Sequence, residues 1–201
     1  QTWGLKHTTA TNAGLITGLF VVLAPIADRV LNGVVLRRIA WVAVFLSLVG
    51  MTLLTGRLPT DLAFGDLLVL GCAVAFGVHI ALLSRHAPGH DPRALTTAQM
   101  LGVAIVFAVM WPATGTLEAP PREVWFALAL TGLVASTVAY GIQTWAQRHL
   151  STARTAVILT TEPMFAALFG ILLAGERLGP SQMLGAVLIL SAVVMSEALP
   201  A

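Results

Sequence analysis

The chain has 201 residues, of which 57% are hydrophobic and only 10% are charged, and its formal net charge is +2. A water-soluble domain carries about 25% charged residues, so this composition excludes an ordinary soluble fold and indicates a membrane protein. The small net charge and the spread of basic residues between apolar segments exclude a nucleic-acid partner. A single cysteine, Cys72, excludes an intrachain disulfide and a CxxC metal site, so we expect no metal and no cofactor.

Apolar segments of about 20 residues recur along the chain, and each is long enough to cross a bilayer as a helix. Residues 1–7 are too few to cross and are interpreted as the end of one further helix. Seven full spans follow, at residues 12–31, 39–55, 62–83, 94–113, 124–146, 155–174 and 182–199. Because lipid offers no hydrogen bonds and no alternating barrel pattern is found, the predicted fold class is all-α, a polytopic transmembrane helix bundle.

The connections between these spans carry most of the basic residues. Residues 84–93 form the most polar connection, and Pro88 and Pro92 forbid a continuous helix through it. The side of the membrane with more arginine and lysine is expected to be cytoplasmic, and the C-terminus lies on that side. Its residues are Arg29, Arg37, Arg38, Arg85, Arg93, Arg148 and Arg154, against Lys6, Arg57, Arg122 and Arg177 on the other side.

The span at residues 155–174 has an acidic residue and a proline near its middle. A carboxylate there costs roughly 2.5–3.5 kcal/mol on insertion scales, so Glu162 predicts a function or a polar contact. Pro163 lacks an amide hydrogen and leaves the carbonyl of Leu159 without its helical partner. The two threonines before Glu162, a neighbouring helix or water can satisfy that carbonyl. We expect this helix to face the interior of a bundle and to break near Pro163.

An internal repeat relates two parts of the chain. At an offset of 142 residues, residues 1–3 (Gln-Thr-Trp) are identical to residues 143–145, and residues 43–50 align with residues 185–192. Between these matches Pro25 pairs with Pro163 at an offset of 138, so the first copy has about one more helical turn before its proline. We expect Pro25 and Pro163 to break the two equivalent helices.

The two copies are predicted to run in opposite directions. Five crossings separate the helix that ends at His7 from the helix that ends at His149, and an odd number inverts the second copy. Inverted repeats are typical of secondary transporters. Residues 1–57 are assigned to the end of helix 3 and to helices 4 and 5, and residues 62–201 to helices 6–10. We therefore expect a ten-helix (5+5) protein in which two helices and most of a third precede Gln1.

Three segments carry a recognisable set of motifs, namely a Glu-Pro pair, a Gly-Glu-Arg turn and a Gly/Ala-rich last helix. They are GLKHTTATNAGLITGLFVVLAP (4–25), QRHLSTARTAVILTTEPMFAALFGILLAGERL (147–178) and SQMLGAVLIL (181–190). With these segments the whole chain resembles the EamA family of the drug/metabolite transporter superfamily. The first copy departs from the pattern, with Ala24-Pro25 in place of Glu162-Pro163.

The resemblance implies a secondary transporter that exports small organic metabolites or drugs by alternating access between inverted repeats. It also implies a multi-pass protein of the cell membrane, in bacteria the inner membrane. The expected partners are a small-molecule solute and the lipid bilayer, and a proton is a candidate coupling ion. Substrate, direction, coupling ion and oligomeric state are not specified by these motifs.

Polar side chains inside the spans are the candidate contacts for substrate and for a coupling proton. Glu162 is a candidate for both roles, or else a carboxylate that caps backbone donors next to the proline. His79 is a candidate coupling group, or else a hydrogen-bonding residue near a helix end. The other candidate substrate contacts are Tyr140, Gln143, Trp145, Asn12, Thr17 and Gln99. The alternatives are an interfacial anchor for Trp145, and helix caps and interhelical hydrogen bonds for the last three.

Two other functions compete with transport. A non-transporting membrane scaffold or an inactive transporter fragment would have the same spans. An intramembrane enzyme is disfavoured because HExxH and GxSxG are absent and no carboxylate pair occurs within a predicted span. No nucleotide-binding loop is present, so a transporter of this sequence would use a proton or solute gradient.

Overall fold

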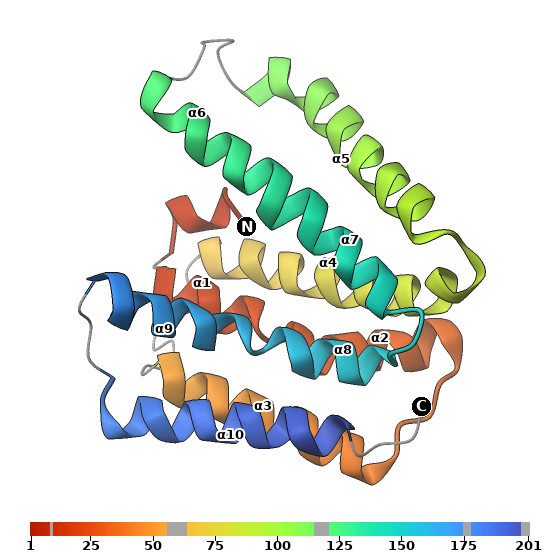
Figure 1. The fold of residues 1–201 in the computed structure, drawn as a ribbon, viewed down its shortest axis with the longest axis vertical. Helices are drawn as coiled ribbons and strands as arrows, with labels where there is room; N and C mark the ends of the chain where they lie inside the picture. The colour runs from red at the N-terminus through yellow and green to blue at the C-terminus, as the bar shows by residue number, and fades with distance from the viewer. Residues whose placement is uncertain (9, 56–63, 115–120, 175–177, 198–201) are drawn as a thin grey trace. The chain divides into compact units, whose positions relative to one another are not determined.

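The computed structural model describes the chain except for residues 9, 56–63, 115–120, 175–177 and 198–201 (Figure 1). Every regular element among the described residues is a helix and none is a strand, which confirms the all-α fold class. The α-helices are α1 (Ala10–Thr17), α2 (Phe20–Asn32), α3 (Arg38–Thr55), α4 (Phe64–His86), α5 (Pro92–Thr114), α6 (Arg122–Ala129), α7 (Ala139–Ala146), α8 (Thr152–Leu159), α9 (Glu162–Ala174) and α10 (Pro180–Glu197). The remaining elements are 3₁₀ turns η1 (Gly4–Lys6) and η2 (Ala87–Gly89) and a π-helix, η3 (Leu130–Val138).

Each predicted span coincides with a helix or with helices in sequence. α4 ends at His86 and α5 begins at Pro92, so the connection with two prolines interrupts the helix as predicted. Four stretches of the described residues are long and apolar enough to cross a membrane, and two further apolar helices are shorter. The four are Ala13–Asn32, Phe64–Gly89, Pro92–Met110 and Arg122–Ala146, and the two are Arg38–Leu54 and Pro180–Met195. These helices make the chain a multi-pass membrane protein. Residues 56–61, with Arg57, and the Gly-Glu-Arg turn lie outside the described residues.

The chain forms two compact units, and each is described by itself. The first unit contains residues 1–85 and 150–201, and the second contains residues 86–149. These packing units differ from the repeats assigned on sequence, because α8–α10 belong to the second repeat and pack in the first unit.

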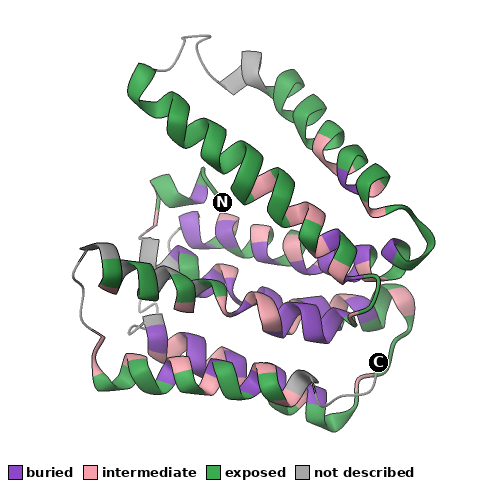
Figure 2. Ribbon diagram, in the orientation of Figure 1, coloured by how far each residue is buried: buried purple, intermediate pink, exposed green. Residues whose placement is uncertain are grey.

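The first unit has a continuous apolar core. α2 packs against α8, and α3 packs along α10. Figure 2 shows buried residues on the facing sides of these helices and on α4. The core cluster comprises Phe20, Val21, Ala24, Ala43, Val44, Ile80, Ala156, Val157 and Ala192. α4 approaches α2 closely at Gly77, where an added Cβ would lie 2.9 Å from the Ala24 nitrogen.

The crossing of α3 and α10 depends on two glycines that leave no room for a side chain. A Cβ at Gly50 would lie 2.8 Å from the Gly185 carbonyl oxygen, and a Cβ at Gly185 would lie 2.6 Å from the Leu54 nitrogen. Gly50 also faces Ile189, whereas Gly185 faces Leu54. A higher residue number on α3 therefore meets a lower one on α10, so the two helices are antiparallel. Small residues allow such close backbone contact in membranes.

Two pairs of consecutive helices in the first unit are separated by short interruptions. Gly18 and Leu19 separate α1 from α2, and Thr160 and Thr161 separate α8 from α9. Thr160 follows Gly18 by the same 142 residues that relate the two copies. The expectation that Pro25 breaks its helix is wrong, because Pro25 lies inside α2 and six residues after Leu19, whereas Pro163 is the second residue of α9.

The second unit is a helical hairpin. α5 forms one arm, and α6, η3 and α7 form the other. The arms contact each other between α5 and α7. Most of the residues on both arms are exposed (Figure 2). Within η3 the hydroxyls of Ser136 and Thr137 donate to carbonyls five residues back, at Thr131 and Gly132, with distances of 2.9 Å each.

Candidate functional site

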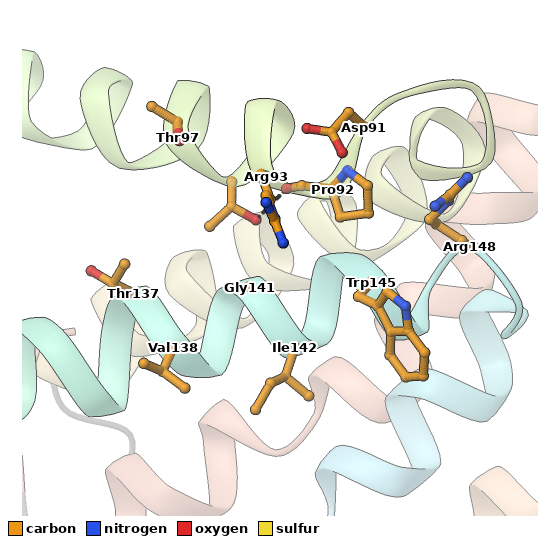
Figure 3. A pocket seen from close by; sticks show the side chains of 11 residues that line it. Asp91, Pro92, Arg93, Thr97, Thr137, Val138, Gly141, Ile142, Trp145 and Arg148 are labelled. Carbon is orange, nitrogen blue, oxygen red and sulfur yellow. Dashed lines mark hydrogen bonds between the residues drawn. The ribbon is translucent and has the colours of Figure 1, made fainter.

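The second unit contains an open hollow between the start of α5 and the segment from η3 to α7 (Figure 3). Its volume is about 700 Å³. The lining residues are Asp91, Pro92, Arg93, Thr96, Thr97, Thr137, Val138, Gly141, Ile142, Trp145 and Arg148. It therefore extends from the polar connection at residues 86–91 toward the apolar part of both arms.

Three charged side chains line the hollow, namely Asp91, Arg93 and Arg148. Asp91 caps α5, because its Oδ2 accepts a hydrogen bond of 3.0 Å from the Ala94 amide, and Pro92 fits the first position of that helix. The exposed guanidinium groups of Arg93 and Arg148 have no hydrogen bond or ion pair to any described residue. With the carboxylate used as a cap, the lining of the hollow has two positive charges without a partner among the described residues.

Apolar side chains from the other arm also line the hollow. Val138, Ile142 and Trp145 follow one another at spacings of three and four residues, so they lie on one face of the arm. All three are more than half exposed. Figure 3 shows Arg93 directed from α5 toward this arm, near Gly141 and Ile142. A Cβ at Gly141 would approach only the Thr96 methyl, at 3.9 Å, so the glycine leaves open space.

The polar candidates on α5 and α7 are brought together only in part. Gln99 Nε2 donates to Thr144 Oγ1 at 3.1 Å and to the Leu95 carbonyl at 3.2 Å, so Gln99 makes an interhelical hydrogen bond. Gln143 Nε2 donates a hydrogen bond of 3.1 Å to Gln147 Oε1, four residues further along the same arm. Trp145 lines the hollow, whereas Tyr140 and Gln143 are not among its lining residues. Of the three candidate contacts Tyr140, Gln143 and Trp145, only Trp145 therefore lines the hollow.

Glu162 lies in the first turn of α9, immediately after the interruption of the helix. The Thr160 hydroxyl donates to the Val157 carbonyl at 2.6 Å, and the Thr161 hydroxyl donates to the Ile158 carbonyl at 2.7 Å. The two threonines therefore satisfy the carbonyls of Val157 and Ile158. Neither hydrogen bond reaches the Leu159 carbonyl, for which the sequence had suggested the threonines as possible partners. Glu162 is exposed in this chain, while Thr152–Val157 of α8 are buried. The expectation that the whole helix faces a bundle interior holds for α8 only.

The remaining candidates lie in the first unit. Thr17 ends α1, and its Oγ1 accepts a hydrogen bond of 3.2 Å from Gln1 Nε2. Asn12 lies on α1, but its side chain is outside the described part of the structure. His79 on α4 is half-buried and stacks on Phe76, with ring centroids 6.3 Å apart.

Three charged residues that are not among the candidate site residues of the sequence analysis are buried. Asp66, in the first turn of α4, is 1% exposed and accepts a hydrogen bond from the Thr8 hydroxyl. Asp28 and Arg154 are 6% and 8% exposed. Asp66 lies inside a predicted apolar span. The cost of inserting a carboxylate into the membrane, which was argued for Glu162, therefore applies to Asp66 as well.

The end of α2 is tied to α4 by a polar cluster. Asn32 Nδ2 donates to Asp28 Oδ1 at 2.6 Å and to the Ala81 carbonyl at 3.1 Å. Arg85 donates to Asn32 Oδ1 at 3.1 Å. Gly33 then ends the helix at φ +71°, a left-handed conformation that glycine adopts without strain.

Comparison with known proteins identifies the family to which this arrangement belongs. The model of the EamA-like transporter family matches residues 63–197, from the start of α4 to the end of α10. The chain belongs to the EamA-like transporter family. An uncharacterized transporter of Archaeoglobus fulgidus is 37% identical over 195 residues, which are 97% of this chain and 63% of that protein. The chain thus spans less than two thirds of the length of this relative.

Other relatives agree with this family. The uncharacterized transporter YwfM of Bacillus subtilis is 25% identical over 206 residues, which cover 98% of this chain and 69% of YwfM. A solved crystal structure has a TM-score of 0.84 at 19% identity and covers 98% of this chain and 72% of its own. At that identity the similarity shows the helical fold alone.

Proposed function

We propose that this EamA-family chain is part of a secondary transporter that moves small organic solutes across the cell membrane. The observation that carries the proposal is the pair of interrupted helices, α1/α2 and α8/α9, at equivalent points of the repeat. Interrupted helices are where secondary transporters place substrate and coupling ions, because they offer backbone groups without helical partners. The relatives named as transporters support the same function.

The proposed architecture is a ten-helix protein of two inverted five-helix repeats, with seven full spans and the end of an eighth in this chain. The α3–α10 crossing supports it. At the offset of 142, Gly50 corresponds to Ala192 and Gly185 corresponds to Ala43. If symmetry relates the two copies, the contact of Gly50 with Gly185 implies a contact of Ala192 with Ala43, and both alanines belong to one core cluster. A twofold relation between antiparallel α3 and α10 would produce this pattern. The first five-helix repeat would include residues 1–57, and the second would be residues 62–201.

The proposed transport cycle is alternating access, with the two repeats rocking around a central solute. Export, a cytoplasmic C-terminus and an inner-membrane location in bacteria remain parts of this proposal. They rest on the family and on the arginine-rich side of the spans.

Glu162 is the proposed coupling or substrate-binding group of this transporter. It is exposed at the N-terminal end of a half-helix, where the helix dipole favours a negative charge and where a solute or a proton can reach it. Tyr140, Gln143, Trp145, Asn12, Thr17 and Gln99 are proposed as weaker contacts, and His79 as a second coupling candidate. The existing hydrogen bonds of Thr17 and Gln99 favour a structural role for these two.

The test is transport by the full-length protein in proteoliposomes with an imposed proton gradient and a panel of labelled metabolites. We expect gradient-dependent flux of at least one solute. Flux of none, from a protein that is folded and inserted, would support the scaffold alternative. Turnover of a lipid or solute into a new product would instead support an intramembrane enzyme.

Substitution of Glu162 tests the site separately from the function. We expect Glu162→Gln to lower flux at least tenfold or to abolish its dependence on pH, because the amide cannot bind or release a proton. Glu123→Gln is the matched control, since Glu123 also lies in the first turn of an exposed helix and has no proposed role. Unchanged flux and pH dependence in Glu162→Gln would remove Glu162 from the mechanism without affecting the transporter assignment.

A further inference from the structure

One face of α9 has a row of exposed side chains, which we call the α9 stripe. It consists of Glu162, Phe165, Phe169 and Leu172. Spacings of three, four and three residues place these side chains on one side of the helix, as in the seam between two packed helices. Glu162 is exposed, and the three apolar side chains are 56%, 55% and 67% exposed. The α9 stripe therefore has the pattern of a helix-packing surface without a helix packed on it.

Neither lipid nor water alone suits the α9 stripe. Glu162 lies near the middle of a predicted span, and acidic residues at that depth face the interior of a bundle or a water-filled cavity because hydrocarbon does not solvate a carboxylate. The two phenylalanines and the leucine, in turn, gain nothing from water. A transmembrane helix packed on the α9 stripe would cover the aromatic part and would keep the acid inside the protein.

The internal repeat relates the start of the α9 stripe to a surface of α2 that α4 covers. Glu162 and Ala24 are the residues before the two paired prolines, at the offset of 138. Ala24 is fully buried, and a Cβ at Gly77 of α4 would lie 2.9 Å from the Ala24 nitrogen. One turn earlier, Phe20 contacts Phe76 edge-on, with ring centroids 5.1 Å apart. In the first copy this surface is thus occupied by a helix.

The direction of α4 identifies the helix that would occupy the α9 stripe. Gly77 meets Ala24, and further along both helices Asn32 donates to the Ala81 carbonyl at 3.1 Å, so α2 and α4 run parallel. In the proposed ten-helix protein these are helices 4 and 6, which cross the membrane in the same direction. Exchanging two inverted five-helix repeats converts a contact of helices 4 and 6 into a contact of helices 9 and 1. Helices 9 and 1 also cross in the same direction, so this contact is parallel as well.

We propose that the first transmembrane helix of the full-length protein, which precedes Gln1, packs parallel to α9 and covers the α9 stripe. This inference rests on the ten-helix architecture proposed above. The Archaeoglobus relative is long enough to include such a helix, because the residues that match this chain are only 63% of its length. Glu162 would then lie between helices of the two repeats, where a carboxylate is shielded from lipid and can respond to their relative movement.

The test is photo-crosslinking of the full-length protein in its membrane, with p-benzoylphenylalanine in place of Phe165 or Phe169. The matched control is the same replacement of Phe45, a phenylalanine of α3 that is 65% exposed and lies outside the α9 stripe. Since crosslinking requires direct contact, we expect about tenfold more crosslinked peptide from upstream of Gln1 at the two stripe positions than at Phe45. Crosslinks from the stripe to lipid alone or only to residues 1–201, or equal upstream crosslinking from Phe45, would overturn the proposal.

A second measurement decides the case if the crosslinker variants fail to insert. Phe169→Ala in the full-length protein should shift the unfolding equilibrium toward the unfolded state by about a hundredfold, because a covering helix would lose its contact with the ring. Phe45→Ala, at a residue exposed to lipid, should shift it less than about fivefold. Equally small shifts in both variants would overturn the proposal.

The packing and the transport function can fail separately. Solute flux without either result would refute the packing of the first helix on the α9 stripe and would leave the transporter proposal in place. Upstream crosslinks from a protein without flux would support this packing and would refute transport.

Discussion

The first and second units differ in what their apolar side chains meet. In the first unit Val21, Ala43 and Ile80 are fully buried against neighbouring helices. In the second, Ile105, Phe107 and Leu133 are each more than 60% exposed. All six lie in predicted apolar spans. Lipid tails are as apolar as a protein core, so hydropathy in a membrane protein reports insertion and does not report packing.

The glycines show the same contrast. Gly50, Gly77 and Gly185 lie where two backbones meet in the first unit, whereas Gly102 and Gly132 of the second have no non-local neighbour within 4 Å of an added Cβ. A small residue in a span is therefore a packing residue only where a partner helix is present. The following predictions use this contrast, with matched substitutions in the two units.

The largest effect is expected for Gly185→Leu. Its Cβ would lie 2.6 Å from the Leu54 nitrogen, and because backbone atoms cannot move aside, α3 and α10 must separate. We expect the free energy of unfolding to fall by about 3 kcal/mol or more. Gly102→Leu, in open space, should change it by less than about 0.5 kcal/mol. Unfolding in mixed micelles with increasing SDS measures both, and equal losses would contradict the contrast.

A smaller effect is expected when a large side chain is shortened. Ile80→Ala would leave a cavity in the core cluster with Phe20 and Val44, at a cost of about 2–3 kcal/mol. Ile105→Ala, at a residue that is 61% exposed, should cost less than about 1 kcal/mol. Thermal unfolding in detergent provides the measurement. A loss at Ile105 as large as that at Ile80 would mean that the exposed face of α5 is covered in the full protein.

The smallest effect concerns the hydrogen bond that joins the arms of the second unit. Gln99→Met would remove the contact with Thr144 and keep the size of the side chain, for a loss of about 0.5–1 kcal/mol. Hydrogen exchange in α5 and α7 should increase, while exchange in α3 should not change. Met100→Leu on the neighbouring residue is the control, and unchanged exchange in Gln99→Met would show that the hydrogen bond does not hold the hairpin together.

Much of the helical arrangement could be predicted from residue order. Prolines and polar turns located the ends of α4 and α5, and Pro163 located the interruption between α8 and α9, whereas the interruption between α1 and α2 lies six residues before Pro25. The candidate residues were less predictable. Gln99 could be read as a substrate contact or as an interhelical donor, and only the position of Thr144 favours the second. The buried Asp66 was overlooked because it lies near a span end, where carboxylates are ordinarily solvated.

The sequence by itself determined that the chain is an all-helical membrane protein and where most of its helices begin and end, and it predicted two copies of one motif. These properties follow from local chemistry, since backbone groups in lipid must bond within the helix and proline cannot donate. Tertiary structure alone decided that Gly50 meets Gly185, that Glu162 is exposed, and that two arginines share a hollow with Trp145. Such contacts join residues far apart in the chain, and in an apolar solvent no hydropathy difference marks them beforehand.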